Sequence, residues 1–248
     1  MGPLVRVRLL VAYHGLRFHG LAPQPGLRTV VGELATALGK VLRMEPPVLA
    51  MSGRTDAGVH AWGQVLSFDA PDGAEVSDLS RKLTRMLGPE IVVRSAEVVS
   101  GDFHARHSAV GRRYRYTLLA RAEADPFLAD TTWWVPEPLD LRAMRAACDP
   151  LIGKHDFGAF CRRQGDAILV RDLRSAEWVM PSEGLLRFDV EASSFCQQMV
   201  RSLVGTLVDV GRGKRTTADV MTALRHPDRT NAGPVAPPHG LCLWEVLY

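Results

Sequence analysis

Cysteine is scarce in this sequence, and its spacing argues against two kinds of small-domain framework. The four cysteines lie far apart and form no Cys-x-x-Cys pair: Cys148, Cys161, Cys196 and Cys242. Zinc knuckles and disulfide-stapled domains both rely on closely spaced cysteines. We therefore expect neither a zinc site nor a disulfide framework, and a reducing cytoplasm fits this cysteine usage.

Long apolar runs are also missing. No stretch approaches the ~20 residues of a membrane-spanning helix, and Arg6 and Arg8 interrupt the apolar residues near the N-terminus. A cleavable signal peptide would need an uninterrupted apolar segment there. The sequence thus predicts a soluble, unprocessed chain with no membrane partner.

An excess of one charge is missing as well. Thirty Lys and Arg residues face 27 Asp and Glu residues, and the net charge is only +3. Such a mild attraction to polyanions does not alone identify a nucleic-acid binder. The basic residues nevertheless gather in short clusters: Arg81-Lys82 with Arg85, Arg112-Arg113 with Arg115, Arg162-Arg163, and Lys214-Arg215. Each alone is typical of solvated surface, whereas together on one face they would follow RNA phosphates.

Apolar residues are plentiful, at 46% of 248 residues, which is enough for one large domain or two small ones. A period of two predicts strands, over residues 5–11, 64–69, 91–99, 112–119, 169–180, 186–192 and 241–247. Helical spacing predicts helices near 29–42, 77–87, 140–151, 194–211 and 218–224. We expect them to be capped by Thr29, by Ser77, by Asp140 and by Ser193 or Ser194.

Both halves of the chain start with a strand and a helix and then return to strands. This order predicts an α+β fold of two loosely similar halves around antiparallel sheet, covering residues 1–105 and 106–248. No Ser- or Gly-rich linker separates them, so we expect close packing with a cleft between the halves.

One presented loop lies at the centre of the first half, Gly53-Arg54-Thr55-Asp56-Ala57-Gly58-Val59-His60-Ala61. Its two glycines permit positive φ, and Ala57 leaves room for another molecule to approach the backbone. Unlike a serine, a carboxylate such as that of Asp56 needs no partner base to attack an electrophilic carbon. A turn aspartate that caps its own backbone would fit the same residues.

These nine residues resemble the signature of the tRNA pseudouridine synthase A family. Further matching segments follow the same order over essentially the whole chain: Phe18-His19-Gly20, Phe103-His104-Ala105-Arg106, Arg112-Arg113-Tyr114-Arg115-Tyr116, His155-Asp156-Phe157, Met199-Val200-Arg201 and Ala232-Gly233-Pro234. The resemblance implies the pseudouridine synthase fold, with two similar sub-domains of antiparallel sheet, helices packed on one side, and a central basic catalytic cleft. This sequence departs from the family's usual Phe-x-Gly-Trp-Gln run, because Leu21 and Ala22 stand in place of the tryptophan and the glutamine.

The same resemblance implies roles for four residues. Asp56 would be the catalytic carboxylate, Tyr114 would stack on the flipped base, and Arg201 would pair with the aspartate. Arg54 would contact a phosphate or help to extrude the base. Each has a structural alternative: a core tyrosine in a strand, an arginine at the wet edge of a helix, and a guanidinium that only stabilises its loop.

Two histidines, His104 and His107, have the spacing of half a metal site. No further ligand spacing supports a metal. Structural or RNA-facing roles therefore fit these histidines better, and we expect no metal.

The implied activity is isomerisation of uridine to pseudouridine at positions 38, 39 and 40 of the tRNA anticodon stem-loop, by a cytoplasmic homodimer. This reaction breaks the N1–C1′ bond and joins C5 to C1′ without net redox change, so it requires no cofactor. Whether Asp56 attacks C6, attacks C1′ or acts through a glycal stays open.

Two other functions fit parts of the sequence. A glycoside hydrolase could use Asp56 as its nucleophile, but retaining hydrolysis needs a second carboxylate nearby, and the signature supplies an arginine. An RNA-binding module without turnover would be expected to lose Asp56 or Tyr114, and both are present.

Overall fold

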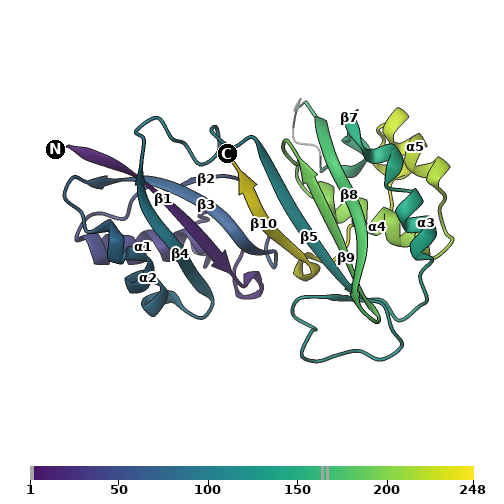
Figure 1. Cartoon of the computed structure of the whole chain (residues 1–248), viewed down its shortest axis with the longest axis horizontal. Helices are drawn as coiled ribbons and strands as arrows, with labels where there is room; N and C mark the ends of the chain where they lie inside the picture. The colour runs from purple at the N-terminus through teal and green to yellow at the C-terminus, as the bar shows by residue number, and fades with distance from the viewer. Residues whose placement is uncertain (1–2, 163–164, 166–167) are drawn as a thin grey trace. The chain divides into compact units, whose positions relative to one another are not determined.

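The computed structural model describes residues 3–162, 165 and 168–248. It divides into two units, Met1–Val110 with Leu243–Tyr248, and Gly111–Cys242. Each unit combines antiparallel strands with helices (Figure 1), so the α+β class expected from the sequence is confirmed. Arg163, a member of one predicted basic cluster, lies outside the described residues. In the part of the chain that is described, no helix has the length and apolarity needed to cross a membrane.

The first unit is built on a sheet in the order β4-β1-β3-β10, with β2 also paired to β3. Its strands are β1 (Leu4–Tyr13), β2 (Ala50–Met51), β3 (His60–Pro71), β4 (Ile91–Val99) and most of β10 (Leu241–Leu247). In β1 the fully buried Val7, Leu9 and Val11 alternate with Arg8 and Leu10. One face is therefore closed by helices α1 (Val30–Leu42) and α2 (Leu79–Leu87), as Figure 1 shows.

The second unit has a sheet in the order β5-β9-β8-β7. Its strands are β5 (Gly111–Leu119), β6 (Trp133–Trp134), β7 (Gly153–Asp156), β8 (Val170–Ser182) and β9 (Leu185–Ala192), and β6 pairs with β5 in parallel. Its helices are α3 (Leu141–Ala146), α4 (Met199–Gly211) and α5 (Thr217–Arg225). The predicted alternation in β9 is confirmed, since Leu186, Phe188, Val190 and Ala192 are all buried.

Two of the expected helix caps are confirmed. The side chain of Thr29 accepts a hydrogen bond from Gly32 N (3.2 Å), and that of Asp140 accepts one from Ala143 N (3.0 Å). The predicted helix over 140–151 nevertheless ends at Ala146, and a separate 3₁₀ turn covers Asp149–Leu151. Pro150 has no N–H to donate, so it begins a new turn rather than extending a helix.

The other two predicted caps are wrong. Ser77 lies inside a 3₁₀ turn, Val76–Asp78, that leads directly into α2, so it cannot flank that helix. Helix α4 begins at Met199 rather than near residue 194, because its N-cap residue Gln198 has a left-handed backbone (φ 65°) that ends the preceding loop. Residues 193–197 therefore form a loop, and neither serine caps α4.

Helix α4 forms the buried centre of the second unit. A Cβ at Gly205 would overlap the carbonyl oxygen of Pro234, so only glycine lets the helix approach this loop so closely. The guanidinium of Arg215 donates to Asn231 O (2.8 Å) and Ala232 O (3.0 Å) and thereby also holds this loop.

One cysteine pair contradicts the sequence-based expectation. Cys161 and Cys196, 35 residues apart, are joined by a disulfide. The expectation was wrong for this pair because the 3₁₀ turn Gly158–Phe160 and the loop before α4 meet only in the folded unit. Cys148 and Cys242 are not joined by a disulfide.

We predict that Gly205→Ala destabilises the protein even though alanine favours helices. The added methyl group meets a backbone carbonyl that cannot rotate away, and such overpacking costs about 1–3 kcal/mol. Urea unfolding would measure the loss. Gly101→Ala is the control, because a Cβ there meets nothing within 4 Å. Equal stability of the two variants would contradict the close packing described for α4.

Candidate active site

The central loop is fastened at its start by a buried glutamine. Gln64 is fully buried, and its side chain accepts from Ser52 Oγ (2.6 Å) and donates to Gly53 O (3.0 Å). Its oxygen also accepts from Val65 N (3.1 Å). Because a buried amide is costly to leave unpaired, these bonds fix the chain where it leaves β2.

The middle of the loop is held through Thr55. The Oγ1 of this buried residue lies 2.7 Å from the phenolic oxygen of Tyr13, and its carbonyl accepts from Leu21 N at 3.2 Å. Gly20 has φ +90°, and a Cβ there would lie 3.0 Å from the same carbonyl oxygen. The segment around Phe18-His19-Gly20 is thus packed on the signature loop.

Asp56 follows Thr55 at the turn of the loop. It is half-buried, whereas Arg54 and Ala57 on either side are exposed. Its carbonyl accepts from Val59 N (3.2 Å), and Gly58 adopts a positive φ of the kind that glycine permits, +79°. Gly53 does not have a positive φ. Asp56 and Arg54 therefore lie on one loop whose anchors are the residues beside them.

The end of the loop is braced by His60, which is buried. Its Nδ1 accepts a hydrogen bond from Gly15 N (3.0 Å), so the neutral ring carries its proton on Nε2. The ring of His14 lies 4.5 Å from that of His60. The structure thus supports a structural role for His60.

The loop that carries Gly15 and Gly20 is itself secured by Glu90. His14 N donates to Glu90 O (2.9 Å), and the guanidinium of Arg28 lies 2.7 Å from the Glu90 carboxylate. The hydrogen bond from Arg28 lowers the pKa of Glu90, and the same bond raises the pKa of Arg28. Since both side chains keep contact with solvent, this pair positions the loop more than it stabilises the fold.

Tyr114 lies on β5 in the second unit. It is 8% exposed, and the ring of Phe195 meets it edge-on with 5.1 Å between the centroids. Among its arginine neighbours, Arg113 and Arg115 lie on the opposite face of the strand and pair with carboxylates of β9, Glu191 and Asp189. Because successive side chains of a strand point to opposite faces, these two arginines do not lie beside the Tyr114 ring.

Arg201 lies in the first turn of α4. Its Nε donates to Ala236 O (2.7 Å), and Ala236 N donates back to Arg201 O (3.1 Å). Tyr116 OH donates to the neighbouring Pro237 O (2.8 Å), and burial raises the pKa of that tyrosine. The loop before β10 therefore fixes the plane of the Arg201 guanidinium.

His104, one of the two histidines considered as a metal half-site, forms hydrogen bonds within its own turn. The Nδ1 of His104 accepts from Arg106 N (3.1 Å) and His107 N (3.3 Å), so it closes a turn. Burial, followed by the nearby His107, lowers the pKa of His104. Within the described ranges no group of three or more potential metal ligands occurs.

Sequence reasoning missed several supporting residues. The signal for Gln64 is a lone amide between apolar strand residues, whereas Tyr13 and Phe195 show no local signal. Taken together, the first unit holds an aspartate and an arginine on a rigid loop. The second holds an aromatic ring and an oriented guanidinium, which are groups that can hold a planar base and an anion.

Comparison with known proteins places the chain in a family. A family model described as tRNA pseudouridine synthase matches residues 147–248. A tRNA pseudouridine synthase A of Geobacillus kaustophilus is 41% identical over 98% of this chain and 94% of its own length. One of Frankia casuarinae is 43% identical over 99% of this chain and 90% of its own.

Among solved structures, a chain of a Cbf5-Nop10-Gar1 complex aligns with 82% of this chain and 45% of its own. The identity is 14% and the TM-score 0.34, which is too low to bear on fold or function. The relatives above, similar over nearly their full length, decide the matter. The chain belongs to the tRNA pseudouridine synthase A family.

Proposed function

We propose that this protein isomerises uridine to pseudouridine in tRNA, at positions 38, 39 and 40 of the anticodon stem-loop. The observation that carries the proposal is 41% identity to a tRNA pseudouridine synthase A over 98% of the chain. Asp56, Tyr114 and Arg201 all lie within that span. A tRNA substrate also points to the cytoplasm as the place of action.

Asp56 is the proposed catalytic carboxylate. It is half-buried on a loop fastened through Gln64, Thr55 and His60, so its position varies little. Such preorganisation matters because a carboxylate that starts a covalent rearrangement must meet the reacting carbon at close range. Attack on C6, attack on C1′ and a glycal route all use the same carboxylate.

Tyr114 is the proposed stacking partner of the flipped uracil. The edge-on contact with Phe195 fixes its ring plane, and a fixed ring gives a base a surface on which to stack. Arg201, oriented through Ala236 O, is the proposed partner of the Asp56 carboxylate. Arg54, exposed on the signature loop, is the proposed contact to a phosphate or to the extruded base.

The bonds broken and formed in the proposed reaction determine which cofactors the enzyme needs. The N1–C1′ bond breaks, C5 joins C1′, the hydrogen on C5 leaves to solvent, and N1 gains a proton. No electron enters or leaves and the isomerisation has no second substrate to activate, so the chemistry requires no redox cofactor or ATP. In this proposal the half that spans residues 1–105 supplies the carboxylate, and residues 106–248 supply the stacking ring and the guanidinium.

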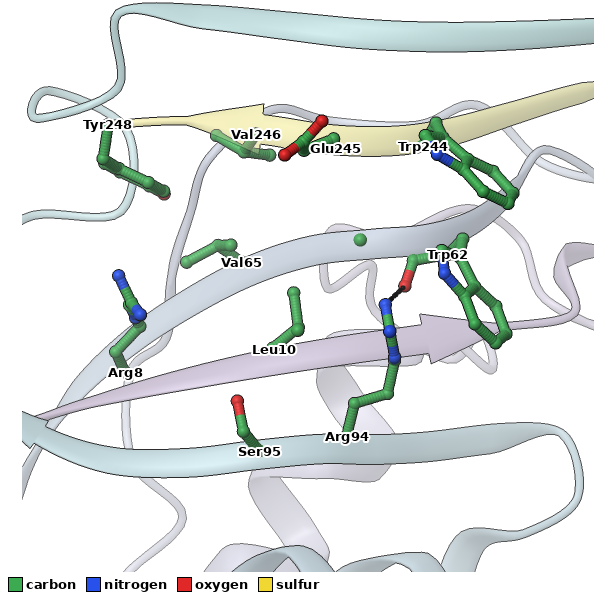
Figure 2. A pocket seen from close by; sticks show the side chains of 11 residues that line it. Arg8, Leu10, Trp62, Val65, Arg94, Ser95, Trp244, Glu245, Val246 and Tyr248 are labelled. Atoms are coloured by element: carbon green, nitrogen blue, oxygen red, sulfur yellow. Dashed lines mark hydrogen bonds between the residues drawn. The ribbon is translucent and has the colours of Figure 1, made fainter.

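A homodimer is also proposed, and one face of the first unit supports it. This face, opposite α1 and α2, holds a hollow of about 430 Å³ between β1, β3, β4 and β10 (Figure 2). The rings of Trp62 and Trp244 stack there with centroids 5.9 Å apart, and the Arg94 guanidinium lies 4.2 Å from the Trp62 ring centroid. A tryptophan pair with one exposed ring, Trp62, beside arginine is typical of a protein interface, and a second copy of the chain is the proposed occupant.

The proposed reaction predicts that Asp56→Asn abolishes activity. The amide has no anionic oxygen to start the rearrangement, so release of tritium from tRNA labelled at uridine C5 should fall below detection. Asp69→Asn is the matched control, because Asp69 is a surface carboxylate paired with Arg6 (2.6 Å). Tritium release by Asp56→Asn at the wild-type rate would refute the role of Asp56, and free uracil in place of C-linked nucleoside would indicate hydrolysis.

The stacking role predicts that Tyr114→Phe and Tyr114→Leu behave differently. Phenylalanine keeps an aromatic face, whereas leucine removes it, and a stacked base contributes roughly 1–3 kcal/mol. Pseudouridine formation under single-turnover conditions should therefore fall sharply for Tyr114→Leu and much less for Tyr114→Phe. Equal rates for both variants, with equal thermal stability, would show that the ring only fills the core.

The proposed dimer predicts that Trp62→Glu produces a monomer. Glutamate removes one ring of the stacked pair and brings a carboxylate that must lose its water at the interface, which disfavours association. Sedimentation velocity at micromolar protein should show a dimer for the wild type and a monomer for the variant. Phe127→Glu is the control, because Phe127 is 94% exposed in the other unit. A wild-type monomer under these conditions would reject the proposal.

A further inference from the structure

The disulfide between Cys161 and Cys196 joins two loops of the second unit. Cys161 directly follows the 3₁₀ turn Gly158–Phe160, and Cys196 lies in the loop between β9 and α4. Their Cα atoms are 5.8 Å apart, which is the usual separation for a disulfide. Cys161 is 3% exposed and Cys196 is half-buried.

The backbone holds the two cysteines together independently of the sulfur atoms. Arg162 N, next to Cys161, donates to Gln197 O, next to Cys196, at 2.9 Å. Met199 N donates to Cys196 O at 3.1 Å, which fixes the loop on the start of α4. Two thiols held this close have a high effective concentration toward each other, and this favours an intramolecular disulfide over mixed adducts.

The loop that carries Cys196 also supports the residues proposed to bind the substrate. Phe195, one residue earlier, packs edge-on against Tyr114. Gln198, two residues later, is the left-handed N-cap of α4, and Arg201 lies in the first turn of that helix. A covalent bond at Cys196 therefore restrains the segment Phe195–Gln198. This segment packs on Tyr114 at its start and leads into the helical turn that carries Arg201.

A cavity beside Cys161 gives small molecules a route to this member of the pair. A cavity of about 470 Å³ is lined by Cys161 and Arg162, by Gln198, and by Arg229 with Asp228 beside it. Its volume suits a peptide-sized thiol or disulfide, and its two arginines against one carboxylate favour an anionic one. Oxidised and reduced glutathione carry carboxylates and fit this description.

We infer that Cys161 and Cys196 form a reversible dithiol–disulfide site whose bonded state holds the Phe195–Gln198 segment in the tRNA-binding arrangement. The oxidant is a low-molecular-weight disulfide. One cysteine thiolate attacks a sulfur of that disulfide and releases one thiolate, and the second cysteine then attacks the mixed disulfide and releases the other. Two protein thiols are oxidised, one small disulfide is reduced to two thiols, and the two protons pass to solvent or to those products.

The effect on tRNA rests on the proposed function, whereas the disulfide itself does not. Closing a loop of this length restricts the unfolded chain and fixes the loop before α4. Reduction should therefore lower thermal stability and weaken tRNA binding through Tyr114 and Arg201. Cys148 is not expected to react in this way. It is buried, its thiol donates to Met144 O (3.3 Å), and burial raises its pKa to about 12.

Peptide mapping of the full chain tests the disulfide. The protein is equilibrated in glutathione buffers from fully reduced to fully oxidised, the remaining thiols are alkylated, and the digest is analysed without reductant. We expect the peptides of Cys161 and Cys196 to become linked as oxidised glutathione increases. The peptides of Cys148 and Cys242 should stay unlinked in every buffer. Thiols or glutathione adducts at both positions in the oxidising buffer would overturn the inference.

Thermal melting and tRNA binding test the effect of the disulfide on the Phe195–Gln198 segment. Oxidation should raise the melting temperature by roughly 5–10 °C and tighten binding of an unmodified tRNA transcript a few-fold. Both changes should disappear in Cys196→Ala and persist in the control Cys242→Ser. A linked pair that changes neither quantity would reject the effect on the segment. A chain that binds no tRNA in either state would reject the proposed function, and mapping and melting would still decide whether the disulfide forms.

Discussion

The buried amide of Gln64 is the constraint on which the first unit depends. It satisfies Ser52 Oγ and Gly53 O at the point where the chain leaves β2 and enters the signature loop. Thr55, bonded to Tyr13, holds the next residue, and Asp56 follows directly. An aspartate in an untethered loop would sample many positions, and most of them would be unproductive for chemistry. Here hydrogen bonds in a dry environment limit that freedom.

The second unit reaches a similar rigidity by packing. Gly205 lets α4 touch the carbonyl of Pro234, and this loop in turn orients the Arg201 guanidinium through Ala236. Arg215 and Arg229 donate to carbonyls of the same loop, at Ala232 and Gly233. The loop is thus held by packing against the helix backbone and by hydrogen bonds from guanidinium groups. The disulfide at Cys196 adds a covalent tie on the other flank of α4.

Local patterns predicted the elements well where one signal dominated. The alternation in β9 and the caps at Thr29 and Asp140 depend only on near neighbours, and the structure confirms them. The start of α4 was predicted wrongly because Ser193 and Ser194 are good caps by type. The chain instead places Phe195 against Tyr114 and turns at Gln198 with a left-handed backbone. A tertiary contact overrode the local preference.

The sequence by itself determined the class of fold, the family signature and the choice of Asp56, Tyr114, Arg54 and Arg201 as candidates, because these follow from residue identity and order. Only the tertiary structure decided which groups support them. Gln64 reaches Ser52 across 12 positions, and Cys161 reaches Cys196 across 35. Contacts between residues distant in sequence depend on how the strands pair and the loops close, and a local pattern carries no record of that.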